Sequence, residues 1–309
     1  MNHHIAIGVD VGGSHITSAA VDLDTLEIIS GSTFSVNVDN KAEKDEIVKK
    51  WSHAINSTIE RLGLILNVKI GFAMPGPFNY RQGIALFEGS NDKYEKLFNV
   101  SIPEELSKYL NTKDASYRFL NDATSFAVGA SAIGKAKNCR KIIALTLGTG
   151  FGSAFIENGI PLIDRLDVAK NGCLWDKPFI NGIADDYFST RWCLLRYEEL
   201  SGHKTIGVKE IVEQDPTTAK LLFDEFGDNM GQFLLTYLKQ FQPELVVIGG
   251  NIAKASHLFL PKLKHKISDA GLDIDIEIST DTEDAAIIGS AKLFHLDFWN
   301  AISDDIPTN

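Results

Sequence analysis

The sequence is poor in the features that mark secreted, membrane-bound or nucleic-acid-binding proteins. Its 309 residues include only three cysteines, Cys139, Cys173 and Cys193, and no C-x-x-C pair. An odd number of widely spaced cysteines argues against a disulfide framework and against a zinc knuckle. We therefore expect free thiols in a reducing cytoplasm and no zinc site.

Long apolar runs and an excess of basic residues are also absent. No run approaches the roughly 20 residues that a membrane helix requires, and the N-terminal MNHHIAIGVD lacks the basic and apolar regions of a signal peptide. Asp and Glu outnumber Lys and Arg by 41 to 30, which gives a net charge of −11. That charge disfavours nucleic acids and anionic membranes as partners, and we expect neither.

What the sequence has is an ordinary globular composition, with 44% apolar residues, in a chain long enough for about two domains. Its N-terminal part predicts a hairpin, a third strand, a helix and a buried strand. These elements are expected over 5–10, 17–23, 28–38, 43–62 and 68–73.

The same pattern recurs later in the chain and predicts an internal duplication. Asn158-Gly159 is a strong turn signal between two of the later strands. The expected elements are strands over 141–147 and 153–157, a helix over 219–241, a strand over 244–248 and a last helix over 284–298. The polar tail after Trp299 is expected to fray.

Three glycine turns follow predicted strands. The first, Asp10-Val-Gly-Gly-Ser14, offers backbone N–H groups, a hydroxyl and a carboxylate able to hold hydrated Mg²⁺. The second is Leu147-Gly-Thr-Gly-Phe-Gly152, and the third is Val246-Val-Ile-Gly-Gly-Asn251. Each alone is also compatible with an ordinary hairpin bend or with tight packing of a strand against a helix.

A carboxylate motif lies between the first two turns. In Phe119-Leu-Asn-Asp-Ala-Thr-Ser125, an apolar strand delivers Asn121 and Asp122 at its carboxyl end, where open α/β sheets place their chemistry. The alternative is a helix N-cap, a position that favours Asn and Asp.

Taken in chain order, these segments resemble the ROK family of sugar kinases and repressors, part of the actin and hexokinase ribonuclease-H-like superfamily. The stretch Asp10-Val-Gly-Gly-Ser-His-Ile-Thr-Ser-Ala-Ala-Val-Asp22 resembles the family's first phosphate motif, and Leu145-Thr-Leu-Gly-Thr-Gly-Phe-Gly152 resembles its second. Met74-Pro-Gly-Pro77 is similar to its proline turn. Asn121-Asp122 stand where the family has its sugar-binding Asn and catalytic Asp. The resemblance covers essentially the whole chain.

The resemblance implies an α/β fold of two ribonuclease-H-like, actin-like ATPase lobes with a hinged cleft between them. A small N-terminal lobe is expected over 1–120 and a large lobe over 121–284, with a C-terminal helix over about 285–309 packing back on the small lobe. The resemblance also implies a homodimer.

A site and a reaction follow from the same resemblance. Asp122 would accept the proton of a sugar hydroxyl, since a reference pKa of about 3.9 keeps an Asp ionised at neutral pH. ATP would be the phosphoryl donor, with Mg²⁺ held by Asp10 through water. The nucleotide-binding residues are expected to be Asp10, Gly12, Gly13, Ser14, Gly148, Thr149, Gly150, Gly249, Gly250 and Asn251. The sugar-binding residues are expected to be Asn121, Asn91, Asp185 and Gly76.

The sequence departs from the family pattern after the second phosphate motif. Many members carry Glu-x-Gly-His and a cysteine-rich zinc loop there, and this chain has neither. Gly182-Ile-Ala-Asp-Asp-Tyr-Phe-Ser189 aligns Asp185 with a sugar-contacting Glu. The missing His contact has no evident replacement, although Asp167 or Asn171 could occupy its space. Upstream, Asn91 matches a sugar-contacting Asn, with Asp92 as the alternative.

The sequence therefore predicts an ATP-dependent kinase of a hexose or an N-acetylhexosamine, similar to glucokinases. The missing Glu-x-Gly-His leaves the sugar open and motivates an alternative, a catalytically weak sugar-binding pseudokinase. A DNA-binding repressor is disfavoured, because a first strand at Ile5 leaves no room for a helix-turn-helix and the chain is acidic.

Overall fold

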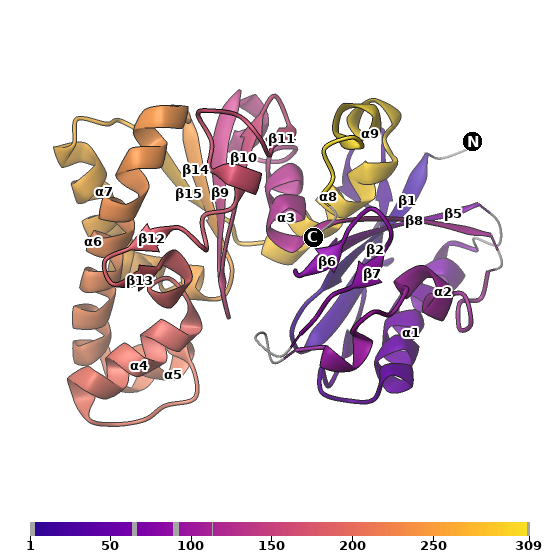
Figure 1. Ribbon diagram of the computed structural model, residues 1–309, viewed down its shortest axis with the longest axis horizontal. Helices are drawn as coiled ribbons and strands as arrows, with labels where there is room; N and C mark the ends of the chain where they lie inside the picture. Colours follow the sequence, from indigo (N-terminus) through magenta and orange to yellow (C-terminus); the bar gives the residue numbers. More distant parts are fainter. Residues whose placement is uncertain (1–3, 64–66, 89–92, 113, 308–309) are drawn as a thin grey trace. The chain divides into compact units, whose positions relative to one another are not determined.

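The computed structural model describes residues 4–63, 67–88, 93–112 and 114–307. The chain forms two compact units, coloured along the sequence in Figure 1. The first unit comprises Met1–Gly134 and Glu283–Asn309, and the second comprises Lys135–Thr282. The chain thus passes between the units after helix α3 (Asp122–Ala130), whereas the boundary expected from the sequence lies before that helix, near Asn121.

The first unit is built on a six-stranded sheet with strand order β3-β2-β1-β5-β8, in which β4 also pairs with β2. Strands β1, β5 and β8 are parallel to one another, and β2 runs antiparallel to β1. The sheet strands are β1 (Ile5–Val11), β2 (His15–Asp22), β3 (Glu27–Ile28), β4 (Phe34–Asn37), β5 (Val68–Met74) and β8 (Ala115–Asn121). The other elements are α1 (Lys44–Leu62), the hairpin β6 (Phe78–Asn79) and β7 (Ile84–Ala85), α2 (Ile102–Leu106), α3, α8 (Thr282–Ala291) and α9 (Leu296–Ile302).

The second unit repeats this plan with the strand order β11-β10-β9-β14-β15. In each unit an antiparallel hairpin is joined to two further parallel strands, and a long helix, α1 or α6, precedes the first of these. The predicted duplication is therefore confirmed. The strands are β9 (Lys141–Leu147), β10 (Phe151–Glu157), β11 (Ile160–Leu162), β12 (Pro178–Phe179), β13 (Gly182–Ile183), β14 (Leu245–Gly249) and β15 (Asp275–Ile278). The helices are α4 (Thr190–Ser201), α5 (Val208–Gln214), α6 (Pro216–Phe241) and α7 (Ser256–Asp269).

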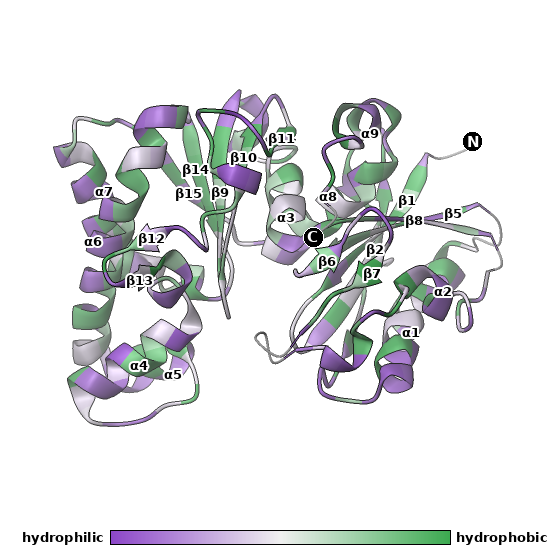
Figure 2. Ribbon diagram, viewed as in Figure 1, coloured by the Kyte–Doolittle hydropathy of each residue, from purple (hydrophilic) through white to green (hydrophobic). Residues whose placement is uncertain are grey.

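The sequence explains why these elements form. The central strands are continuous apolar runs, as buried parallel strands require, and Figure 2 shows them mostly green. On α1 the predicted stripe of Ile47, Trp51, Ile55 and Ile59 is buried. The predicted turn at Asn158 and Gly159 has positive φ at both residues, 52° and 74°, as a two-residue hairpin turn demands.

Three sequence predictions were wrong in detail. The single strand expected over 28–38 is two short strands, because Gly31 takes a φ of 73° and the Ser32 side chain turns back to the backbone of Ala20. The last helix is not continuous over 284–298, since His295 is extended between α8 and α9. The tail is held by Arg81, whose guanidinium donates to the carbonyls of Asp304 and Ile306.

Helix α8 packs unusually closely in the first unit. A Cβ on Gly8 would stand 2.1 Å from the carbonyl oxygen of Ile287, and one on Gly289 would stand 1.9 Å from that of Ser125. The Ser290 hydroxyl accepts the backbone N–H of Val9 at 3.2 Å, a further contact between α8 and β1. This packing brings Glu283, on the first turn of α8, close to β2. In the described part of the chain, no helix is both long and apolar enough to cross a bilayer.

Candidate active site

The carboxyl ends of three parallel strands meet at one edge of the first unit's sheet. Asp10 on β1 is in register with Ala73 on β5, which is in register with Leu120 on β8. Asp10 therefore lies two strands away from Asn121 and Asp122, at the same edge. The sheet register alone brings together the metal-binding and catalytic carboxylates expected from the sequence.

The first glycine turn leaves the same edge and is fastened from several sides. Its Gly12 N–H donates to the His15 carbonyl at 3.0 Å, which closes the β1–β2 hairpin. The hydroxyl of Tyr94 donates to the Gly12 carbonyl at 2.7 Å, and the Asn40 amide donates to the Gly13 carbonyl. Ser14 is exposed at the tip. The turn thus has the space and the exposed hydroxyl expected of an anion-binding loop.

Asn121 and Asp122 combine a structural role with an available carboxylate. Asn121 is the N-cap of α3: its Oδ1 accepts the Thr124 N–H at 3.2 Å, and its amide donates to Asp122 Oδ1 at 2.9 Å. Asp122 Oδ1 also accepts the Ala123 N–H at 2.9 Å. Both of these contacts hold the same oxygen, so the carboxylate is fixed through Oδ1. The N-cap alternative is therefore correct for Asn121.

Burial dominates the electrostatics of this edge. Desolvation, with the nearby charges of Asp122 and Glu283, raises the pKa of Asp10 from 3.8 to about 8. Desolvation also raises the pKa of Asp122, against the lowering effect of the Ala123 N–H and the Lys93 charge. An ordinary reference pKa was therefore the wrong basis for the charge of Asp122, because it omits the cost of burying the ion.

Gly76, one of the expected sugar-binding residues, lies near this edge. Gly76 is exposed in the turn that follows β5, and a Cβ there would stand 3.4 Å from the hydroxyl of Tyr80. That hydroxyl accepts the Asn121 amide at 3.3 Å, so Tyr80, which the sequence motifs did not include, connects Gly76 with Asn121. Asn91 and its alternative Asp92 lie outside the described residues.

In the second unit the second glycine turn, at the carboxyl end of β9, is braced by α4 and the segment before it. Thr190 donates both its N–H and its hydroxyl to the Gly148 carbonyl, each at 2.8 Å. The Asp185 carboxylate accepts the Phe151 N–H at 2.7 Å. A Cβ on Gly150 would stand 3.1 Å from the same carboxylate oxygen. Thr149 and Gly150 are exposed, so the turn is held from behind with its tip open.

The third turn lies directly beside the second. Gly249 on β14 is in register with Thr146 on β9. Gly250 takes a φ of 93°, and a Cβ there would stand 2.3 Å from the Leu147 carbonyl oxygen, so only glycine fits. Its N–H donates to the Thr282 hydroxyl at 3.0 Å, and Asn251 is exposed at the start of the following helical turn. The structure thus brings two predicted nucleotide turns together within one unit.

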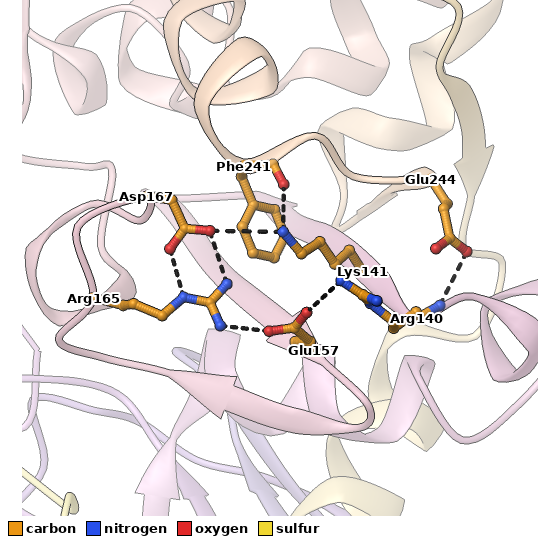
Figure 3. Close-up of polar contacts among 7 residues, drawn as sticks. All are labelled: Arg140, Lys141, Glu157, Arg165, Asp167, Phe241 and Glu244. Atoms are coloured by element: carbon orange, nitrogen blue, oxygen red, sulfur yellow. Dashed lines mark hydrogen bonds and ion pairs between the residues drawn. The ribbon is translucent and has the colours of Figure 1, made fainter.

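Asp185 and Asp167 are both occupied by contacts within the second unit. Besides the Phe151 N–H, Asp185 binds Arg191 at 3.1 Å. Asp167 pairs with Arg165 and lies 3.7 Å from Lys141 at the start of β9, in the ion-pair cluster of Figure 3. The second turn leaves the opposite end of β9. Asp167 therefore stabilises the far end of this sheet, which removes the reason to place it in a sugar site.

Sequence reasoning missed the residues that support the motifs. Tyr80, Tyr94 and Thr190 lie outside every glycine motif, and each forms a side-chain hydrogen bond with a motif residue. Lys93, also outside the motifs, lies beside Gly13. Only contacts between segments distant in the sequence identify them, and no local signal marks such contacts.

The residues at the first edge fit a magnesium ion and a phosphate chain. Mg²⁺ prefers oxygen ligands, keeps several waters and uses one or two carboxylates, one of which Asp10 can supply. Among the residues that the structure describes, no group of three or more His, Cys, Asp or Glu side chains is arranged to hold a metal.

Comparison with known proteins identifies relatives over nearly the whole chain. The model of the ROK family matches residues 6–167. The glucokinase of Thermotoga maritima is 27% identical over 93% of this chain and 96% of its own length. The N-acetyl-D-glucosamine kinase of Mannheimia succiniciproducens is 26% identical over 93% of this chain and 98% of its own.

A solved structure shares the fold. A ROK family glucokinase from Streptomyces griseus, crystallised with glucose and AMPPNP, superposes with a TM-score of 0.70 at 20% identity. The match covers 94% of this chain and 98% of that one. The predicted class, an α/β fold with two units of the actin-like ATPase type, is confirmed.

Proposed function

This chain belongs to the ROK family, and from that membership we propose that it transfers the γ-phosphoryl group of ATP to a hydroxyl of a hexose or an N-acetylhexosamine. The relatives named above support a sugar as the acceptor. AMPPNP in the Streptomyces griseus structure supports ATP as the donor. The observation that carries the proposal is the shared sheet edge of Asp10, the first glycine turn and Asp122.

Each residue of that edge has a part in the proposed reaction. Asp122, fixed through Oδ1, accepts the proton of the attacking hydroxyl at Oδ2. Its raised pKa makes it a stronger base than an ordinary Asp, provided that it is ionised when the sugar binds. Asn121 orients it, because the Asn121 amide donates to the same carboxylate. Gly76 and Tyr80 line the adjacent sugar position, and Asn91 and Asp185 remain proposed sugar contacts.

The glycine turns are assigned to the nucleotide. Gly13 and Ser14 in the first unit, and Thr149 and Gly150 in the second, would donate N–H groups and hydroxyls to phosphate oxygens. Gly12 and Gly148, whose N–H groups close the two turns, would let the phosphates approach the backbone closely. Gly249, Gly250 and Asn251 would adjoin the rest of the nucleotide. A bound Mg²⁺, reached by Asp10 through water, would neutralise charge on the phosphates. These donors would position the γ-phosphoryl group, and positioning is a large part of what catalysis of phosphoryl transfer requires.

The pseudokinase alternative keeps one specific observation in its favour. The family's Glu-x-Gly-His is absent, and Asp167 does not replace it because it is paired with Arg165. Under this alternative the chain binds sugar and nucleotide without turnover. From the family resemblance we also propose a homodimer that works in the cytoplasm.

A sugar panel tests the proposal. Purified protein is mixed with Mg·ATP and, in separate reactions, glucose, mannose, fructose, allose, N-acetylglucosamine or N-acetylmannosamine. ADP release is measured, and the sugar phosphate is identified by mass spectrometry. We expect at least one sugar to stimulate ADP release well above the sugar-free rate. That sugar should yield one molecule of sugar phosphate for each ADP released. Silence with every sugar, together with measurable sugar and nucleotide binding, would favour the pseudokinase.

A further inference from the structure

A lysine outside the glycine motifs lies against the first glycine turn. Nζ and Cε of Lys93 are each 3.3 Å from the position that a Cβ on Gly13 would occupy. The lysine residue is half-buried, and its ammonium lies beside the turn. A side chain at position 13 would displace it. The absence of a side chain on Gly13 therefore leaves room for the ammonium as well as for a ligand.

The neighbouring residue fixes Lys93 in this place. Tyr94 is fully buried, with its ring edge-on to Trp51 at 5.4 Å. Its hydroxyl donates to the Gly12 carbonyl, and its N–H donates to the Asn40 carbonyl at 2.9 Å. Asn40 in turn donates to the Gly13 carbonyl. Lys93 is thus the residue next to an anchor that grips the glycine turn directly.

Three acidic residues, Asp10, Asp122 and Glu283, lie at this edge. The charges of Asp122 and Glu283 raise the pKa of Asp10, and the charge of Lys93 lowers the pKa of Asp122. His15 is already bound to Glu283 at 2.9 Å. A triphosphate brought to such an edge meets like charge, so its approach requires compensation in addition to N–H groups.

We propose that Lys93 contacts the γ-phosphate of ATP at the first glycine turn and supplies positive charge to the transferred group. An ammonium on a flexible stem suits this task, because it binds phosphate oxygens as a point charge without a fixed fork geometry. The proposal rests on the proposed kinase function and assigns that site a residue that the motifs omit.

Nucleotide binding tests the proposal without requiring turnover. The Kd values of Mg·AMPPNP and Mg·ADP are measured by calorimetry for the wild type, Lys93→Met and Lys96→Met. Lys96 is the matched control, because it is three positions away, 54% exposed and paired with Glu43 at 3.4 Å. We expect Lys93→Met to weaken Mg·AMPPNP about tenfold, the scale of one hydrogen bond to a charged group, and Mg·ADP less than about twofold. Lys96→Met should change neither.

Turnover supplies the second readout. With any sugar that the wild type phosphorylates, Lys93→Met should lower kcat by about 10²-fold, as the loss of one charge-stabilising donor does, and Lys93→Arg should recover part of it. Equal weakening of both nucleotides by Lys93→Met, no weakening, or no nucleotide binding by the wild type would each overturn the proposal. If the wild type phosphorylates no sugar, the proposed function fails, while the comparison of Mg·AMPPNP with Mg·ADP still decides the role of Lys93.

Discussion

Asp10 and Asp122 illustrate how two residues of one type acquire different chemistry from their surroundings. Both end strands of the same sheet, and desolvation raises the pKa of each. Asp10 receives additional like charge from Asp122 and Glu283. Asp122 is partly compensated by the Ala123 N–H, Asn121 and Lys93. The sequence supplies the residue type, and burial together with the surrounding charges and hydrogen bonds determines its protonation.

The first prediction concerns the pH dependence of catalysis. A protonated Asp122 cannot accept the hydroxyl proton, so activity falls as pH drops through its pKa. Because that pKa is raised, the acid limb of kcat/KM should lie clearly above pH 4, where an ordinary Asp titrates. A pH profile with a saturating fixed nucleotide checks this. An acid limb near pH 4, where an ordinary Asp titrates, would contradict the raised pKa of Asp122.

The second prediction concerns stability and Asp10. A carboxyl with a raised folded-state pKa binds its proton more tightly in the folded than in the unfolded chain, so rising pH disfavours the folded state between about pH 4 and about pH 8. Asp10→Asn removes that ionisation. We expect the variant to exceed the wild type in Tm at pH 8 in the absence of Mg²⁺, with the difference shrinking towards pH 4. A variant less stable than the wild type at pH 8 would refute the assignment.

At the scale of elements, the second glycine turn depends on the segment before α4. The Asp185 carboxylate receives the Phe151 N–H that follows the turn, so its loss should loosen the turn. We expect Asp185→Ala to raise the KM for ATP about tenfold, equivalent to one charge-assisted hydrogen bond. Asp167→Ala, which removes an Asp from the opposite end of β9, is the control and should leave both KM values within about twofold. Initial rates at varied ATP and sugar provide the measurement.

The outcome also separates two interpretations of Asp185. An effect confined to the sugar KM would support the role aligned from the family pattern and contradict the turn-bracing role. An Asp167→Ala variant with a raised sugar KM would restore Asp167 as a sugar contact.

Helix α8 gives a prediction about packing. A Cβ on Gly289 would stand 1.9 Å from the Ser125 carbonyl oxygen of α3, a clash that only backbone movement relieves. Gly289→Ala should therefore destabilise the protein by about 3 kcal/mol, the upper range of overpacking. Gly271→Ala is the control, because Gly271 has a φ of 75° but open space around it. This substitution should lower the free energy of unfolding by about 1 kcal/mol. Denaturant unfolding of both variants measures the difference, and equal costs would contradict the close packing.

The elements themselves were largely predictable, and the exceptions have physical causes. The apolar runs predict the strands, and the four-residue spacing of apolar side chains predicts α1. Both can be recognised because each pattern is local in the sequence. The break at His295 and the fastening of the tail by Arg81 depend on contacts with distant segments. In the candidate site, too, the glycine motifs could be recognised in the sequence, whereas Tyr80, Lys93 and Thr190 could not.

At the scale of the whole molecule, duplication explains the order of the motifs. Each unit has a hairpin whose turn carries glycines, so two glycine turns recur at equivalent places in the two sheets. The net charge of −11 makes local compensation at these turns necessary for an anionic nucleotide. Backbone N–H groups, Mg²⁺ and Lys93 would share that task.

The most direct test of the account compares the wild type with Asp122→Asn on the sugar that the wild type phosphorylates best. We expect kcat to fall by about 10²–10⁴-fold, the usual effect of removing a general base, while Tm and the Kd of Mg·AMPPNP hardly change. Full turnover by Asp122→Asn would show that another group accepts the proton, and the proposed mechanism would be wrong.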